Sequence, residues 1–341
     1  MLKASIITDN SQWEAFVASQ EHTLFLQSAN YIHFLKEMGE EPRIVGLFED
    51  EKLVGGSLVS GVRARRGHYI VLPYGPLLDY SKSEHIAVFF DFVKELATKE
   101  KYDFIRISPF EQMKPERVAV LKKYGFLRAP IHILAEHTWM LNIESDEDML
   151  LANMNKNHRN LIRRCMRDGV EIRMTTDDAA IDRLNNMTDT VAKRHNFHRF
   201  SRKFIRGEME TFAAKNQSVI FEARLPDGRV DASAMFIFYG NMAAYRHSAS
   251  LHLDNKHPSS YLIQWEAIKE AKKRGIMWYN FWGIAPKDAP TNHPFYGITH
   301  FKKGFGGQER ELIPCHDLPL KKKYYLTRLF ETARSIKRGF K

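Results

Sequence analysis

Two stretches of the chain alternate apolar and polar residues around a short polar turn, which is the pattern of a β-hairpin. They lie at residues 43–61, RIVGLFEDEKLVGGSLVSG, and 218–240, SVIFEARLPDGRVDASAMFIFYG. Each is followed by a segment with apolar residues three and four apart, HIAVFFDFVKELATKE or YLIQWEAIKEAKKRG, which predicts a helix. Each helix leads into a predicted strand, YDFIRISP or IMWYNFWG. The pattern therefore predicts an α/β (α+β) fold with mixed sheets flanked by helices.

These elements form an internal repeat. After each strand comes a Lys-Lys-aromatic-glycine segment, KKYGF or KKGFG, and corresponding positions of the two series are 174 to 180 residues apart. A nearly constant separation over successive elements predicts a duplicated domain. We expect the first domain at 1–143 and the second at 144–316, followed by a helix in 317–341. That helix should bury one apolar stripe, formed by Tyr325, Leu326, Leu329, Phe330 and Ala333.

The charge of the chain is unevenly distributed. The formal net charge is +10, but residues 1–142 carry a net charge of −1, so the excess lies in the remainder. Within the tail, residues 317–341 hold eight basic and two acidic residues. This asymmetry indicates a polyanionic or phosphorylated partner, although a merely basic surface is the simpler alternative.

Other functional classes find little support in the composition. Two cysteines are too few for a disulfide framework, which favours a reducing cytoplasm. No apolar run approaches the ~18 residues of a membrane span. His195, His198, His293 and His300 lie pairwise close in sequence, but no third ligand has suitable spacing, so we expect no metal.

A hairpin, a helix and a strand in this order resemble the GNAT acyltransferase fold. GNAT domains usually bind coenzyme A through a glycine-rich loop that opens the central helix, because backbone N–H groups there contact the pyrophosphate. The corresponding loops here, LDYSKSEHIAVFF and LDNKHPSSYLIQW, lack those glycines, and Pro258 removes a backbone donor. We therefore expect no coenzyme A.

Four segments together resemble the FemABX family of peptidyltransferases, which add amino acids to peptidoglycan precursors from aminoacyl-tRNA. They are FLQSANYIHFLKEMG, VGLFEDEKLVGGSL, PSSYLIQWEAIKEAKKRG with YNFWGI, and HPFYGITHFKKGFGG. The resemblance spans nearly the whole chain. It implies two tandem GNAT-like domains with the C-terminal helix packed on the first. No coiled-coil insertion is present, which is typical of the short subtype.

The resemblance also implies roles for particular residues. Phe301 and Lys302 match a pair near the reacting ester and the tRNA 3′ end, so they are the catalytic candidates. Lys36 matches a lysine that contacts the precursor. Arg199 lies near the place of an arginine that grips the precursor's diphosphate, and Arg194 is its rival. Many members have an acidic residue where this chain has Ser108, which leaves a carboxylate role there in doubt.

The required chemistry agrees with these candidates. Aminolysis of an activated ester needs a positioned carbonyl and stabilisation of an oxyanion, but neither a metal nor a covalent nucleophile. A lysine such as Lys302 can supply that charge, whereas Lys303 should point to the opposite face of an extended segment and serve phosphate binding. A solvated lysine on a hairpin is the structural alternative.

Further candidates lie in the second half of the chain. Residues 153–173 read as one helix with Arg159, Arg163 and Arg167 on a shared stripe, suited to tRNA phosphates or simply to solvent. Tyr245 ends a strand before the loop where a GNAT ligand would sit, so it could contact substrate or pack in the core.

The sequence favours one function and leaves two alternatives. The leading hypothesis is a monomeric cytoplasmic aminoacyltransferase that extends the stem peptide of a peptidoglycan precursor, UDP-MurNAc-pentapeptide or lipid II, using aminoacyl-tRNA and no cofactor. One alternative is an acyltransferase acting on an exopolysaccharide, lipid or peptide. The other is a non-catalytic RNA-binding module. Adsorption of the basic tail to an anionic membrane is a second possibility beside its packing on the first domain.

Overall fold

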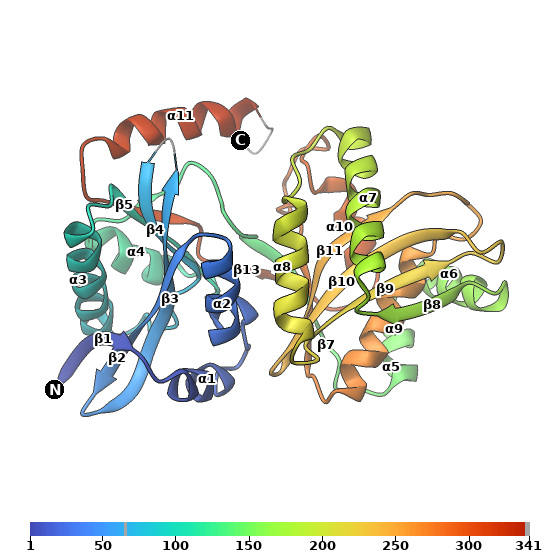
Figure 1. The fold of residues 1–341 in the computed structure, drawn as a ribbon, viewed down its shortest axis with the longest axis horizontal. Coiled ribbons are helices and arrows are strands. Elements are labelled where there is room, and N and C mark those ends of the chain that lie inside the picture. Colours follow the sequence, from blue (N-terminus) through green and yellow to red (C-terminus); the bar gives the residue numbers. More distant parts are fainter. Residues whose placement is uncertain (65–66, 338–341) are drawn as a thin grey trace. The chain divides into compact units, whose positions relative to one another are not determined.

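The computed structural model describes residues 1–64 and 67–337, which fold as two compact units (Figure 1). Unit 1 comprises Met1–Thr138, Gly283–Tyr296 and Arg310–Lys341, and unit 2 comprises Trp139–Trp282 and Gly297–Glu309. These bounds differ from the expected 1–143 and 144–316 because two segments of the second half, 283–296 and 310–316, are grouped with unit 1. No described helix is long and apolar enough to cross a membrane.

The first sheet has seven strands in the order β1-β2-β3-β4-β5-β14-β6. All neighbours are antiparallel except β4 and β5, which run parallel. The strands are β1 Leu2–Ile7, β2 Glu41–Glu49, β3 Lys52–Ala64, β4 Gly67–Tyr74, β5 Phe104–Pro109, β6 Leu127–Arg128 and β14 His316–Pro319. The accompanying helices are α1 Asn10–Ala18, the 3₁₀ turn η1 Phe25–Gln27, α2 Ala29–Glu37, α3 Ser83–Lys99, α4 Pro115–Lys123 and α11 Tyr324–Lys337.

The second sheet has the order β13-β7-β12-β11-β10-β9-β8. Its strands are β7 His137–Asn142, β8 Glu171–Thr175, β9 Ser218–Arg224, β10 Val230–Tyr239, β11 Met242–Ser250, β12 Trp278–Gly283 and β13 Gln308–Glu311. The helices of this half are α5 Glu147–Asn153, α6 Lys156–Arg167, α7 Asp178–His195, α8 Arg202–Ala213, α9 Ser260–Lys273 and α10 Tyr296–Lys303. Among these described helices the longest, α7, has 18 residues, so none has the length of a coiled-coil insertion.

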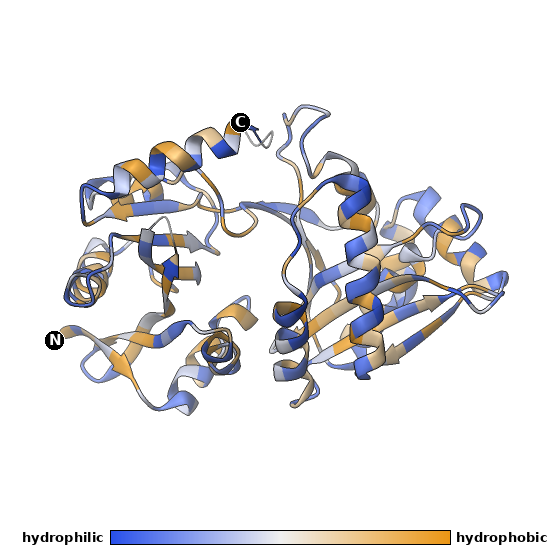
Figure 2. Ribbon diagram, turned by 45° about the horizontal axis from the view of Figure 1, so that its top comes forward, coloured by the Kyte–Doolittle hydropathy of each residue, from blue (hydrophilic) through white to orange (hydrophobic). Residues whose placement is uncertain are grey.

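The two sheets confirm the predicted repeat. Read from one edge, β1 to β5 correspond to β8 to β12, and α3 and α9 occupy equivalent places before β5 and β12. In each unit a central helix buries apolar residues spaced three and four apart, such as Phe89 and Val93 of α3 and Ile268 and Ala271 of α9. Hydrophobic residues accordingly run along the strands of both sheets (Figure 2). Burial of these residues is the main favourable contribution to the stability of each unit.

One strand of each sheet comes from the other half of the sequence. In the first sheet, the strand next to β5 is β14, which lies near the C-terminus. In the second sheet, the strand in the equivalent place next to β12 is β7. Residues 316–319 therefore form a strand instead of the start of the expected helix 317–341, which begins only at Tyr324. Buried Asp317 in β14 binds Arg106 of β5 through two hydrogen bonds of 2.7 and 2.8 Å.

The orientation of α11 also differs from the prediction. The helix belongs to unit 1, but the apolar stripe that it was expected to bury is exposed. Tyr324, Thr327 and Ser335 are the buried positions instead. The prediction of a buried stripe was wrong because the partner surface, around Arg106, is charged.

Candidate functional site

Lys302 lies in the last turn of α10 and is almost fully buried, with 6% of its surface exposed. Burial lowers the pKa of its ammonium from 10.5 to about 7. The segment is helical, so the prediction that Lys302 and Lys303 point to opposite faces of an extended segment was wrong. The two side chains nevertheless differ, since Lys303 is partly exposed, 5.2 Å from the ring of Trp139 and 3.9 Å from Glu309.

The end of α10 is fixed by an aromatic cluster around His158 of α6. Its ring lies 4.7 Å from Tyr261 of α9 and 4.9 Å from Phe305, and its Nε2 is 2.9 Å from the carbonyl oxygen of Phe301. A Cβ on Gly304 would lie 1.9 Å from Cε1 of His158, so only glycine fits there. Since Nε2 donates to that carbonyl, the unprotonated Nδ1 faces inward, and it has no hydrogen-bond partner among the described residues.

Two glycines then turn the chain from α10 into β13. Gly306 and Gly307 have φ angles of 84° and 94°, a region that residues with a side chain rarely adopt. A Cβ on Gly307 would lie 2.3 Å from the carbonyl oxygen of Met140. The indole Nε1–H of Trp139 donates to the carbonyl oxygen of Gly306 at 2.7 Å. The close backbone approach expected of these glycines is therefore made to β7.

A second polar group lies where the parallel pairing of β11 and β12 stops. These strands pair only over 242–244 and 278–280, whereas their counterparts β4 and β5 pair over 69–74 and 104–109. The parallel pairing is therefore three residues long in unit 2 and six residues long in unit 1.

Glu208 of α8 organises the residues just beyond that point. It is fully buried and binds Arg246 at 2.9 Å and His247 at 2.9 Å, both on β11. Burial alone would raise the pKa of Glu208, but Arg246 and His247 hold it below its ordinary value. Burial lowers the pKa of His247, so the cluster contains one carboxylate, one guanidinium and a neutral imidazole. The guanidinium lies 5.2 Å from the ring of Trp282 and 5.4 Å from that of Phe200.

Two arginines proposed for the diphosphate are engaged within the protein. Arg199 binds Asp189 and the side chain of Asn185, and only 13% of its side chain is exposed. Arg194 donates to the carbonyl oxygen of Leu251 at 3.0 Å. To bind a diphosphate, Arg199 would have to break its contacts with Asp189 and Asn185.

The remaining substrate candidates lie in different surroundings. Tyr245 stacks on Phe236 with ring centroids 5.4 Å apart, and its hydroxyl donates to Ser248 at 2.6 Å, which favours packing over substrate contact. Lys36 is exposed in the last turn of α2 in unit 1. Ser108 is buried in β5.

The basic stripe of α6 is only partly available to a ligand. The helix covers Lys156–Arg167 instead of 153–173, because Gly169 ends it and β8 follows. Arg159 donates to carbonyl oxygens at the C-terminal end of α5, including that of Ala152 at 2.9 Å, and so caps that helix. Arg167 pairs with Asp168 at 2.8 Å, whereas Arg163 is exposed.

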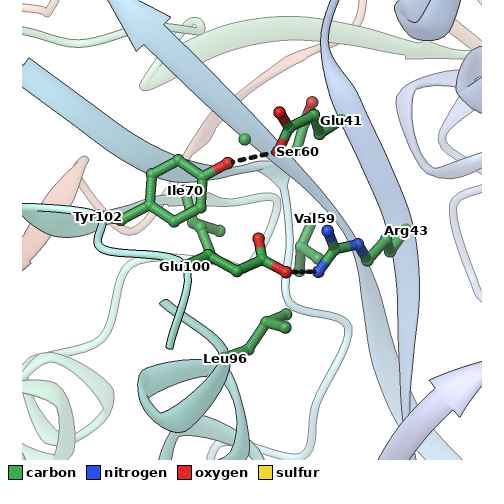
Figure 3. Close-up of a pocket in the computed structure, with 9 residues that line it drawn as sticks. Glu41, Arg43, Val59, Ser60, Ile70, Leu96, Glu100 and Tyr102 are labelled. Carbon is green, nitrogen blue, oxygen red and sulfur yellow. Dashed lines mark hydrogen bonds and ion pairs between the residues drawn. The ribbon is translucent and has the colours of Figure 1, made fainter. Parts of the chain in front are cut away.

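The pocket of unit 1 drawn in Figure 3 is too small for a substrate. Its volume is about 10 Å³, which is the space of one water molecule. Tyr102 donates to Glu41 at 3.0 Å across it, and Arg43 pairs with Glu100. A larger cavity of about 440 Å³ lies beside α11 and is lined partly by Arg106, but by none of the predicted site residues. No group of three or more potential metal ligands gathers within residues 1–64 and 67–337.

His158 and Glu208 were not predicted from the sequence, although a signal for each was present. In α6 the buried positions are His158, Ile162 and Cys165, and in α8 they include Ile205, Glu208 and Met209. A titratable residue on the apolar face of an amphipathic helix is such a signal.

Both the sequence and the fold are similar to those of known proteins. The sequence model of the FemAB family matches residues 8–119 and 223–332, which include α10. The lipid II:glycine glycyltransferase of Staphylococcus aureus (strain USA300) is 21% identical over 391 aligned positions, covering 93% of each chain. The crystal structure of FemX aligns with a TM-score of 0.84 at 18% identity, over 96% of this chain and 100% of FemX. A tandem GNAT protein from the clavulanic acid biosynthesis pathway aligns with a TM-score of 0.61 at 12% identity, over 94% and 98%.

These matches confirm the predicted fold, two tandem GNAT-like domains, and the predicted enzyme class, a transferase. Since the family's sequence model spans more than half of the residues, the chain belongs to the FemAB family.

Proposed function

We propose that this protein transfers an amino acid from aminoacyl-tRNA to the stem-peptide amine of a peptidoglycan precursor. The observation that carries the proposal is the buried Lys302, whose pKa of about 7 lies close to the operating pH. It lies on a helix inside the family match, and relatives across that match are lipid II:glycine glycyltransferases. We propose the cytoplasm as the location and a monomer as the working form.

The reaction assigns Lys302 one task. The neutral amine of the acceptor attacks the ester carbonyl, a C–N bond forms, and the bond from the carbonyl carbon to the ribose oxygen breaks. Negative charge develops first on the carbonyl oxygen and then on the leaving ribose oxygen, while the attacking nitrogen loses a proton. The ammonium of Lys302 stabilises that charge and donates a proton to the leaving oxygen, and the neutral amine left on Lys302 takes up the proton that the attacking nitrogen releases. A lowered pKa makes this donation easier than it is for an ordinary lysine.

The loop that opens α9 supports an acyl donor other than coenzyme A. Asp231, which is buried, accepts hydrogen bonds from the backbone N–H of Leu253 at 2.6 Å and from the hydroxyl of Ser259 at 2.5 Å. A carboxylate of the chain itself therefore satisfies donors near the helix N-terminus, where GNAT domains place a pyrophosphate.

Two other functions make different predictions for the same experiment. A related acyltransferase acting on an exopolysaccharide, lipid or peptide would use the donor but not the precursor. A non-catalytic RNA-binding module would bind tRNA without releasing it uncharged. Lys302 is buried, and the helix end that carries it is closely packed, with His158 against Gly304. This favours catalysis, because RNA binding alone does not require a buried lysine.

The test is transfer from charged total tRNA to UDP-MurNAc-pentapeptide or lipid II, with the product identified by mass. We expect one added residue from the wild-type protein. Lys302→Ala should lower kcat by roughly 10²–10³-fold, as for loss of one oxyanion donor. Lys303→Ala is the matched control and should retain most activity, since that side chain is partly exposed. Equal losses at both lysines, or no product with either acceptor, would contradict the proposal.

A further inference from the structure

The face of α11 that packs on unit 1 is polar. Tyr324 and Ser335 are buried there, and Glu331 binds Arg106 of β5 at 2.6 Å. The hydroxyl of Tyr324 donates to Asp317 at 3.0 Å, and the same carboxylate binds Arg106. The helix is therefore attached through a buried network of charged and polar groups, not through its apolar residues.

The apolar residues of α11 lie outside that network, and of these Phe330 also lines the cavity of about 440 Å³ beside Arg106. Leu326 and Leu329 are each 71% exposed, and Figure 2 shows the hydrophobic colouring along this helix. At 3.6 residues per turn, the exposed apolar positions fall within one arc of about 140°. They are Tyr325, Leu326, Leu329, Phe330, Ala333 and Ile336. We call these six residues the apolar face of α11.

Positive charge borders the apolar face. Lys321, Lys322 and Lys323 precede the helix, and Lys337 is the last residue of its described part. Of the 25 residues in 317–341, eight are basic and only two are acidic. Asp317 and Glu331 both bind Arg106, and Asp103 lies 3.4 Å from Nζ of Lys321 and 3.5 Å from Nζ of Lys323, so these carboxylates offset part but not all of the positive charge around the face.

This charge distinguishes between the two occupants that could cover the face. A second copy of the chain, paired face to face, would bring the two basic borders together, and like charges oppose such pairing. An anionic lipid surface complements the same charges and accepts the apolar side chains. With 14 residues, or about 21 Å at 1.5 Å per residue, α11 is too short to cross a bilayer but long enough to lie on one.

We propose that α11 is a membrane-adsorbing helix that binds an anionic lipid surface through its apolar face. The helix lies in the plane of the headgroups, with Leu326, Leu329 and Ile336 at the boundary of the acyl chains and the lysines among the headgroups. This surface belongs to unit 1 alone and includes none of the residues assigned to transfer. Its test therefore does not depend on the proposed reaction.

The test is co-sedimentation of the full chain with vesicles. We expect the wild-type protein to bind vesicles of phosphatidylglycerol and phosphatidylcholine, to bind vesicles of phosphatidylcholine alone far less, and to dissociate as salt is raised. The double variant Leu326→Glu/Leu329→Glu should lower the partition coefficient at least tenfold. The matched control is Met149→Glu/Met174→Glu, which makes the same charge change at methionines that are 52% and 50% exposed on α5 and β8. That control should lower binding much less, and thermal unfolding should show that both variants remain folded.

A labelled variant reports the position of the helix directly. Cys165 and Cys315 are buried, so Leu329→Cys can be labelled selectively with an environment-sensitive dye. Its emission should shift to the blue with anionic vesicles, whereas the same dye on Met149→Cys should not respond. Absence of binding by the wild-type protein, or an equal loss in both glutamate variants, would overturn the proposal. So would a wild-type dimer that Leu326→Glu/Leu329→Glu converts to a monomer without vesicles, which would show a self-association surface.

Discussion

The protonation state of Lys302 should make the proposed transfer activity depend on pH. Burial lowers its pKa to about 7, so the cationic form is lost as the pH rises through neutrality. If the ammonium stabilises the reacting ester, kcat should fall above about pH 7. In Lys302→Arg the charge persists at every accessible pH, so the smaller remaining activity should not decline in that window. Steady-state transfer across this pH range measures both profiles, and their ratio removes the titration of the acceptor amine, which both variants share. A ratio of wild-type to Lys302→Arg rates that increases through neutrality would show that the neutral amine of Lys302 is the active form.

A stability measurement provides the control for that pH profile. Lysine titrates near 10.5 when unfolded and Lys302 near 7 when folded, so between these values the unfolded chain binds more protons. The contribution of this site to the free energy of unfolding therefore rises with pH across the window and is lowest below about pH 7. Lys302→Met should remove the rise, which we expect to be on the order of a few kcal/mol. An unchanged pH dependence would mean that another group titrates.

Single residues were predictable from sequence only where chemistry and spacing agreed. Lys302 and Phe301 were selected through the family resemblance, but the burial that lowers the pKa of Lys302 depends on how α10 packs. Arg199 has the expected charge, yet its partner Asp189 is ten residues earlier and could not be identified without the turn between α7 and α8. His158 reaches Phe301 across 143 residues of sequence.

At the scale of elements, the position of α10 depends on the fit between Gly304 and His158. Gly304→Ala would place a Cβ 1.9 Å from Cε1 of His158, and overpacking of this kind costs about 1–3 kcal/mol. We expect a lower melting temperature. Transfer should fall as well, because displacement of the helix end moves Lys302.

The matched control lies at the other end of the same helix. Gly297 has no atom within 4 Å of the place of a Cβ, so Gly297→Ala should leave stability unchanged or raise it by up to about 1 kcal/mol. Thermal unfolding and the transfer assay compare the two variants. If both behave alike, the close contact with His158 does not hold α10 in place.

Elements with strong periodicity were predicted well. Both hairpins and the helices α3 and α9 lie where the alternation and the three-and-four spacing indicated. The helical segment 296–303 was not predicted, because it contains a glycine and a threonine and precedes a glycine-rich turn. The face of α11 was predicted wrongly, since periodicity identifies a stripe but not the surface that it meets.

At the scale of the whole molecule, unit 1 depends on the last part of the chain. Ending the chain at residue 315 would remove β14 and α11, and with them both carboxylates that pair with Arg106. The pairing of β14 with β5 and β6 and the burial of Leu318 and Tyr324 would be lost as well. We expect that unit 1 unfolds at a lower temperature or does not fold.

Limited proteolysis and thermal unfolding measure this effect. A chain ending at residue 315 that melts like the full chain would show that β14 is dispensable.

The duplication itself was predictable, because offsets of 174 to 180 residues recur along the sequence. The exchange of β7 and β14 between the two halves was not predictable. These strands have only six and four residues, which is too short for a recognisable alternation of apolar and polar positions.

The place of β14 has a consequence for synthesis on the ribosome. Translation produces residues 1–128 first, yet β5 lacks one neighbour and β6 lacks its only neighbour in the sheet until residues 316–319 have emerged. The N-terminal unit therefore cannot complete its sheet while the chain is still growing, and until then it presents an open strand edge to other nascent chains. Unit 2 gains its last strand from residues 308–311 only slightly earlier. Both units are thus completed almost together, and a chain released before residue 316 is made keeps an open strand edge in its first unit, which favours aggregation.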